Sequence, residues 1–261
     1  MNKRQPFMTD GYYRAMLELC DGSPAFWSAQ ALDEDHPGQA QALRSYQCKQ
    51  DAFEGVLLRY TAGEPVEVLM RPLEHLIGCY ETYQADLARS EGVADVAPLN
   101  IDSCPSNFEE CMQVFSLCIL LQRTDLLARL VGLFDPAGFY AQDTLYESLL
   151  APVMPGRADI DEWYHESYTD LIRAIYAADK GDASRLLKRY CDNWYNGFCG
   201  VGAKWHDSHL DIEDDDGSYY GYWAIEAAAV AYLYGIDDST IDHMVYPREL
   251  VAYARHHGPA Q

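Results

Sequence analysis

The spacing of apolar residues along the chain is helical over most of its length. In residues 45–63 they recur at three- and four-residue intervals, which gathers Phe53, Val56, Leu57 and Tyr60 on one face of a helix. No segment of useful length shows the strict alternation of apolar and polar residues that is typical of a strand. The sequence therefore predicts an all-α fold, a compact multi-helix bundle of antiparallel helical hairpins with no substantial sheet.

Proline and glycine divide the predicted helices. Pro72 is expected to kink or split the helix predicted over residues 64–89, because a proline inside a helix removes a backbone donor. Residues 90–106 carry a glycine, two prolines and broken periodicity, which is typical of a linker. We therefore predict an N-terminal helical module at residues 1–95 and a C-terminal helical module at residues 96–261, packed as one globular unit.

Further helices are predicted in the C-terminal module. The first follows the linker, with Ser106 or Asn107 as its N-cap and with Glu109 and Glu110 in its positively polarised first turn. Two more helices form a predicted pair over residues 161–198, with the second capped by Asp182.

The segment "GYWAIEAAAVAYLYG", residues 221–235, is apolar on most sides and predicts a helix in the middle of the bundle. Its one charged residue is Glu226. A lone carboxylate inside such a helix is costly unless it is paired or hydrogen-bonded. Either it meets a buried arginine or tyrosine that fixes the packing of the helix, or it is a catalytic acid or metal ligand.

Charge is the strongest global signal. The 261 residues include 19 lysines and arginines against 41 aspartates and glutamates, which gives a formal net charge of −22. This balance disfavours direct binding of nucleic acid or of an anionic membrane, and it favours a basic protein partner. Plain solubility explains the same balance equally well.

Several acids are concentrated in one loop before the central helix. An EF-hand does not fit, because a glycine at position six of the calcium loop would be Gly217, which places Ile212 and Trp223 at the two ligand positions that require acids. The loop is interpreted as a solvated acidic segment and as a candidate surface for a cationic partner. Its acids are Asp207, Asp211, Glu213, Asp214, Asp215 and Asp216, and a second acidic candidate surface holds Asp33, Glu34 and Asp35.

An enzyme is the competing interpretation. His206, His209, Asp211 and Glu226 supply the ligand types of a metal-dependent helical hydrolase, in which the metal would activate a bound water molecule. No phosphate-binding loop, nucleophile elbow or HExxH zinc motif is present. We therefore expect no catalytic residues, no metal and no cofactor. A DNA-mimic protein is a third possibility, but it would need acids spread along one face at phosphate-like spacing.

The start of the chain has no apolar leader, and its longest apolar run, residues 114–121, is too short to cross a bilayer. The eight cysteines form no CxxC pair, which is typical of reduced thiols. We expect a cytoplasmic protein that does not enter a membrane.

Two blocks near the C-terminus, "GYWAIEAAA" at residues 221–229 and "YPRELV" at residues 246–251, resemble the signature of the PoNi family. The resemblance extends over roughly residues 45–255. PoNi proteins are immunity proteins to polymorphic nuclease toxins, some of which are delivered by type VI secretion. The motif residues matched here are Tyr220, Tyr222, Trp223, Glu226, Tyr246 and Pro247, and they are expected to define the fold and not the toxin contacts.

The resemblance implies an all-helical cytoplasmic protein, without enzymatic activity, that binds and neutralises a cognate toxin. It agrees with the charge, because a nuclease that grips phosphates presents a basic cleft that an acidic protein complements. A homodimer is also possible. The acidic loop is the expected toxin contact, and the segment from Leu32 to Gly38 is the alternative.

Overall fold

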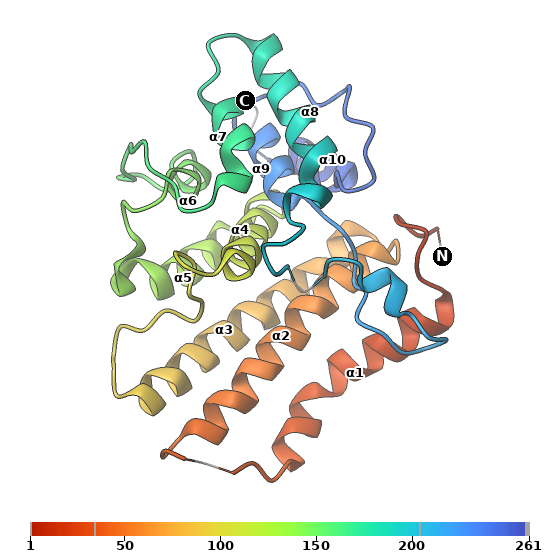
Figure 1. The fold of residues 1–261 in the computed structure, drawn as a ribbon, viewed down its shortest axis with the longest axis vertical. Coiled ribbons are helices and arrows are strands. Elements are labelled where there is room, and N and C mark those ends of the chain that lie inside the picture. The colour runs from red at the N-terminus through yellow and green to blue at the C-terminus, as the bar shows by residue number, and fades with distance from the viewer. Residues whose placement is uncertain (1, 34, 204, 259–261) are drawn as a thin grey trace. The chain divides into compact units, whose positions relative to one another are not determined.

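The computed structural model describes residues 2–33, 35–203 and 205–258 (Figure 1). These residues form ten α-helices and no β-strand, and a single isolated bridge joins Glu213 to Asp216. The predicted all-α fold is therefore confirmed.

The chain forms two compact units, and neither is a continuous stretch of sequence. Unit 1 contains residues 1–98, 129–137 and 207–221, and unit 2 contains the rest. Each unit is described by itself below.

Unit 1 is built on three helices that lie side by side (Figure 1). They are α1 (Asp10–Ala29), α2 (Gln39–Thr61) and α3 (Met70–Glu91), and α2 packs against both of the others. The predicted apolar face of α2 is buried, since Phe53, Val56, Leu57 and Tyr60 are all at most 3% exposed. Removing such side chains from water is the main stabilising contribution to a helix pair of this kind.

The N-terminal residues and the segment around Tyr219 complete unit 1. The Tyr12 hydroxyl donates to the carbonyl of Tyr219 and accepts from its amide, both at 2.8 Å. Thr61 at the end of α2 donates to the carbonyl of Tyr220 at 2.7 Å. Because these bonds are buried, they hold the returning segment against the first two helices.

The break in the second predicted helix differs from the prediction. A short 3₁₀ helix, Val66–Leu69, comes first, and α3 then begins at Met70. Pro72 lies in the first turn of α3, where its missing amide hydrogen costs no hydrogen bond. It therefore neither kinks nor splits the helix, and the break comes before it.

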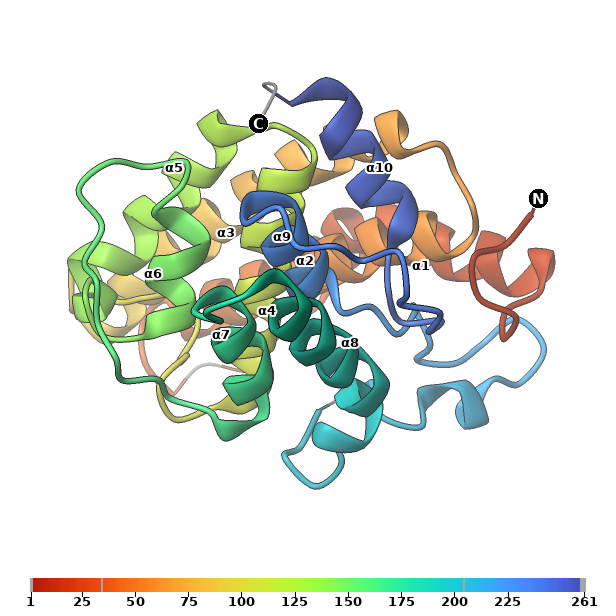
Figure 2. The same cartoon turned by 90° about the horizontal axis from the view of Figure 1, so that it is seen from above.

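Unit 2 surrounds one short apolar helix, α9 (Ile225–Leu233), which contacts α4, α6, α7, α8 and α10 (Figure 2). Its residues from Ile225 to Ala231 are completely buried, which confirms the predicted central helix. The surrounding helices are α4 (Pro105–Leu120), α6 (Thr144–Leu150), α7 (Thr169–Ile175), α8 (Lys180–Gly197) and α10 (Arg248–His257), and α5 (Thr124–Phe134) begins in unit 2 and ends in unit 1.

Four predicted helix starts in unit 2 are wrong. Pro105 occupies the first turn of α4 and Cys104 its N-cap, so Glu109 lies beyond the first turn and is buried. Asp179, not Asp182, caps α8 by accepting from the Asp182 amide at 2.9 Å.

The other two starts come later than expected. Residues 161–165 and 221–224 are irregular, so α7 begins at Thr169 and α9 begins at Ile225. Tyr222 and Trp223 therefore precede the central helix.

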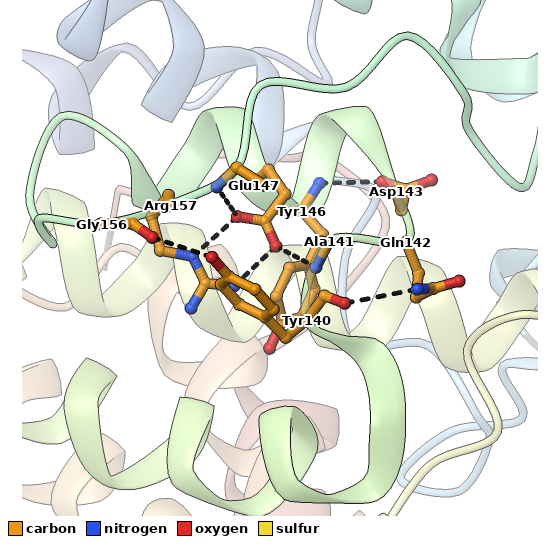
Figure 3. Close-up of polar contacts among 9 residues, drawn as sticks. Tyr140, Ala141, Gln142, Asp143, Tyr146, Glu147, Gly156 and Arg157 are labelled. Atoms are coloured by element: carbon orange, nitrogen blue, oxygen red, sulfur yellow. Dashed lines mark hydrogen bonds and ion pairs between the residues drawn. The ribbon is translucent and has the colours of Figure 1, made fainter.

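An ion pair inside unit 2 fixes the loops around α6 (Figure 3). The Arg157 guanidinium donates to both carboxylate oxygens of Glu147 at 2.7 Å, and the two side chains are 5% and 2% exposed. The backbone amide of Ala141 donates to the same carboxylate at 2.7 Å. This buried glutamate thus receives a matching positive charge.

Candidate functional site

The acidic loop, residues 207–216, folds as a short 3₁₀ helix followed by a tight turn. The helix is Ser208–Asp211, and the turn is closed by two backbone hydrogen bonds of 2.9 Å between Glu213 and Asp216. Asp214 within the turn has a φ of 52°, in the left-handed region that aspartate adopts more readily than most residues. The turn directs its consecutive carboxylates toward solvent, and all four residues from Glu213 to Asp216 are exposed.

This turn forms an open groove with α1, here called the α1 groove. It has a volume of about 670 Å³ and is lined by Ala15, Glu18, Leu19, Glu213, Asp214, Asp215 and Asp216. Within the described residues, none of its carboxylates forms an ion pair with a lysine or arginine. Leu19, one of the lining residues, is 61% exposed. A groove that holds an exposed apolar side chain and several carboxylates is a surface that a cationic protein can complement.

The other predicted contact residues lie outside this groove. Asp207 and Asp211 are exposed in the same loop, and Asp33 and Asp35 are exposed in the connection between α1 and α2. Glu34 falls outside the described residues. The structure thus brings Glu18 and Leu19 to the acidic turn, two residues that lie almost 200 positions away in the sequence.

Unit 2 has an acidic groove of its own, which sequence reasoning missed. It has a volume of about 700 Å³, and Asp161, Glu162, Trp163, Glu166, Thr169 and Arg173 line it. We call it the Trp163 groove. The closely spaced acids of "DEWYHE", residues 161–166, could have indicated this groove. The sequence predicts a helix there, and a helix would distribute these side chains around its surface.

The residues proposed for a metal-dependent hydrolase have separate packing partners. The Tyr195 ring lies 4.4 Å from the His206 ring, and the Phe7 ring lies 4.6 Å from the His209 ring. Across residues 2–33, 35–203 and 205–258, no group of three or more histidine, cysteine, aspartate or glutamate side chains is arranged to hold a metal ion. The geometry therefore gives the hydrolase interpretation no support.

The family-motif residues are buried. Tyr220, Tyr222, Trp223, Tyr246 and Pro247 are all classed with the core, and Glu226 is 0% exposed. The Tyr246 hydroxyl donates to Asp238 at 2.7 Å, which ties the segment before α10 to the turn after α9. These positions are suited to maintaining the fold, and a partner cannot reach them without rearrangement.

Glu226 has the tyrosine partner that was one of the two predicted alternatives. Its Oε1 accepts from the Tyr190 hydroxyl at 2.7 Å and from the Trp194 indole at 2.9 Å. Burial raises the pKa of this carboxyl group to about 7, and the two hydrogen bonds oppose the rise without cancelling it.

A second buried acid lies in the same core. Glu109 on α4 accepts a hydrogen bond of 2.8 Å from the Trp205 indole and another from Gln113. Burial, together with the negative charges of Glu226 and Glu110, raises the pKa of Glu109 to about 8. The two indoles stack with ring centroids 4.4 Å apart and planes 8° from parallel.

None of the described helices is both long and apolar enough to cross a membrane.

Fold and surface together define an all-helical acidic protein with open anionic grooves and a core built from buried motif residues. Residues 141–250 match the model of the family described as "PoNe immunity proteins (PoNi), C-terminal". Over this segment the chain is similar to PoNi-type immunity proteins, which confirms the resemblance noted from the sequence over those residues.

Among solved structures, the fold is similar to the crystal structure of protein PA2201 from Pseudomonas aeruginosa. The similarity has a TM-score of 0.75 at 19% sequence identity, and it covers 98% of this chain and 92% of that one. At this identity the similarity concerns the fold. No curated protein matches the chain.

Proposed function

We propose that the protein binds a cognate antibacterial toxin with a basic nuclease domain and neutralises it stoichiometrically, without turnover. The proposal starts from the match of residues 141–250 to the model of a family of immunity proteins. The observation that carries the choice of contact surface is the α1 groove, where carboxylates that pair with no described lysine or arginine line the same groove as an exposed leucine.

Charge supports a cationic partner. At −22, the chain attracts basic proteins over a distance of about one Debye length, roughly 8 Å at physiological ionic strength. Within the α1 groove, Leu19 would supply an apolar contact that excludes water, while Glu18 and the acidic turn would meet lysines or arginines of the toxin. A nuclease held in this way would be unable to offer its basic cleft to nucleic acid.

Other features of the proposal come from the family. We propose that the chain acts in the cytoplasm of the cell it protects, against a toxin delivered by type VI secretion. The buried motif residues would maintain the fold, and exposed acids would choose the partner. The protein itself would bind neither nucleic acid nor membrane, and assembly as a homodimer is compatible with this role.

The test measures binding to the product of the neighbouring toxin gene. The variant carries Glu18→Lys, Glu213→Lys and Asp215→Lys, three exposed positions whose side chains make no hydrogen bond within the described residues. Asp214 is left unchanged because its left-handed backbone disfavours most replacements. We expect the association rate constant to fall about tenfold or more, because charges at an interface rim act mainly on association.

A matched control separates this site from a general effect of charge. The variant Asp161→Lys, Glu162→Lys and Glu166→Lys makes the same change in net charge at the Trp163 groove. If both variants slow association equally, the effect belongs to net charge and the α1 groove is not the contact. If the control alone slows it, the contact lies on unit 2.

Failure of the unmodified chain to bind the toxin or to protect cells from it would remove the immunity role itself. Metal-dependent hydrolysis by the purified chain would favour the enzyme interpretation instead.

A further inference from the structure

The hydrogen bonds at Glu226 are arranged as those of a neutral carboxylic acid. Both donors, the Tyr190 hydroxyl and the Trp194 indole, reach the same oxygen, Oε1. Oε2 is buried and receives no hydrogen bond from any described residue. A buried carboxylate is stabilised by donors on both oxygens and, above all, by a neighbouring cation. A neutral acid with its proton on Oε2 leaves that hydroxyl without an acceptor, but this costs less than a buried charge without a donor or a cation.

Among the described residues, the groups that face Glu226 and Glu109 add no positive charge. Those that act on the pair are acids, phenols and a thiol: Glu110 on the same helix as Glu109, Tyr168 before α7, and Tyr190 and Cys191 on α8. No lysine or arginine among the described residues hydrogen-bonds to either carboxyl group.

Charged groups elsewhere on the packed helices are engaged with other partners or exposed. On α10, Arg248 pairs with Asp242 and Arg255 pairs with Asp238. On α6, Glu147 pairs with Arg157, while on α8 and α7 Arg189 pairs with Asp170. Asp143 before α6 is buried and caps that helix through the Tyr146 amide. The other charged side chains of these elements are Arg173, Lys180, Asp182, Arg185, Lys188, Asp192 and Glu249, which are exposed or half-buried.

We propose that Glu109 and Glu226 form a shared proton-binding site in the core of unit 2, and that the stability of this unit falls as the pH rises and the site loses its protons. The two stacked indoles of Trp194 and Trp205 each donate to one member of the pair, which holds both carboxyl groups in the same core. This inference does not depend on the proposed function.

The direction of the pH dependence follows from linkage. Burial raises the pKa values of Glu226 and Glu109 to about 7 and about 8, above the ordinary value of 4.5 that applies once the chain unfolds. At a pH between the ordinary and the raised pKa values, the folded state keeps protons that the unfolded state releases. The contribution of the pair is complete below the ordinary value and is lost as the pH rises through the raised values. Because the acids interact, the two steps belong to the pair and not to single residues.

The experiment follows urea unfolding of the whole chain by fluorescence from about pH 5 to about pH 8.5, the window in which the pair gains and loses its protons. The variants are Glu109→Gln, Glu226→Gln and the double variant, since glutamine keeps the shape and the accepting oxygen but has no proton to lose. For the unmodified chain, we expect the folding equilibrium constant to fall at least about tenfold over this range. In the double variant, this fall should be absent or much smaller.

A matched control uses a buried glutamate that has a cation. Glu147→Gln removes the partner of Arg157 and should weaken folding at both ends of the pH range, leaving the fall with pH in place. If the double variant and the unmodified chain lose stability equally as the pH rises, the proposal is wrong.

A second measurement decides the question even if the variants do not fold. Carboxyl-carbon NMR of the unmodified protein should show two glutamate signals that titrate near neutral pH. Each single variant that folds should lack one of these two signals, which assigns the signal to its residue. If every glutamate carboxyl titrates near its ordinary pKa, no shared proton site exists.

Discussion

At the scale of single residues, unit 2 accommodates buried glutamates in two ways. Glu147 is ionised against Arg157, which donates to both of its oxygens. Glu226 meets only neutral donors, a phenol and an indole. Because a buried charge is tolerated when it is paired and is expensive when it is not, the first arrangement depends on its partner being present.

Replacing Arg157 with methionine tests that dependence. The variant leaves Glu147 buried without its cation, and we expect the free energy of unfolding to fall by about 3–5 kcal/mol. Chemical denaturation measures the change. Lys188→Met is the comparison, since its pair with Asp192 is about 40% exposed on both sides (41% and 43%) and such a pair contributes about 0–1 kcal/mol. Equal effects of the two variants would contradict the role given to burial.

The partner of Glu226 was within reach of sequence reasoning, whereas Glu109 was not. A lone acid in an apolar helix has to find a donor, and with 20 tyrosines in the chain a tyrosine was a reasonable expectation. Glu109 looked like an ordinary acid in an exposed first turn. The helix begins earlier than predicted, at Pro105, so Glu109 lies beyond the first turn, and its donor, Trp205, is 96 residues away. Local patterns do not specify contacts of that separation.

At the scale of elements, α9 shows why the fold class was predictable. Its alanines at positions 227, 228, 229 and 231 are fully buried, and five helices pack around it. Small side chains let those helices approach closely. The run of alanines with almost no charge therefore predicts both a helix and its position in the middle of the bundle. The first residue of the helix was less predictable, because Tyr222, Trp223 and Ala224 are buried like the helix that follows, and their composition does not show where the helix begins.

The close packing around α9 predicts a strong response to added volume. Ala228→Leu should lower the free energy of unfolding by about 1–3 kcal/mol or more, because a well-packed core has no room for three extra carbon atoms. Ala85→Leu is the control. It lies at an exposed position of α3, where both residues are good helix formers and we expect little change. Thermal or chemical denaturation gives the comparison, and a neutral Ala228 variant would show that α9 is loosely packed.

At the scale of the whole molecule, the net charge of −22 bears on association more than on folding. Many of the basic side chains are already engaged, as in the pairs of Arg59 with Asp21 and of Arg129 with Glu81. The carboxylates outnumber the basic side chains, and some of the excess carboxylates lie in grooves, where a basic partner could contact them. The acidic turn was visible in the sequence, but its placement beside α1 depends on the buried bonds of Tyr219 and Tyr220.

Steering by this charge predicts a strong salt effect on binding to a basic toxin. Raising the ionic strength from about 0.01 M to about 0.15 M shortens the Debye length from about 30 Å to about 8 Å, so association should slow markedly. Dissociation should change much less. Stopped-flow kinetics at several salt concentrations measures both rate constants. An association rate that does not respond to salt would mean that the excess charge has no part in recognition.

Each unit is built from separate segments of the sequence, and this limits which segments related proteins can exchange by recombination. Residues 207–221 come late in the sequence, yet they complete unit 1, where Tyr219 and Tyr220 bond to Tyr12 and Thr61. If recombination replaced the C-terminal half of the chain, unit 1 would receive a new acidic turn, and unit 2 would receive part of a new core. The new segment would still have to form the hydrogen bonds to Tyr12 and Thr61. We therefore expect hybrids to fold when both parent proteins have the same residues at these contacts.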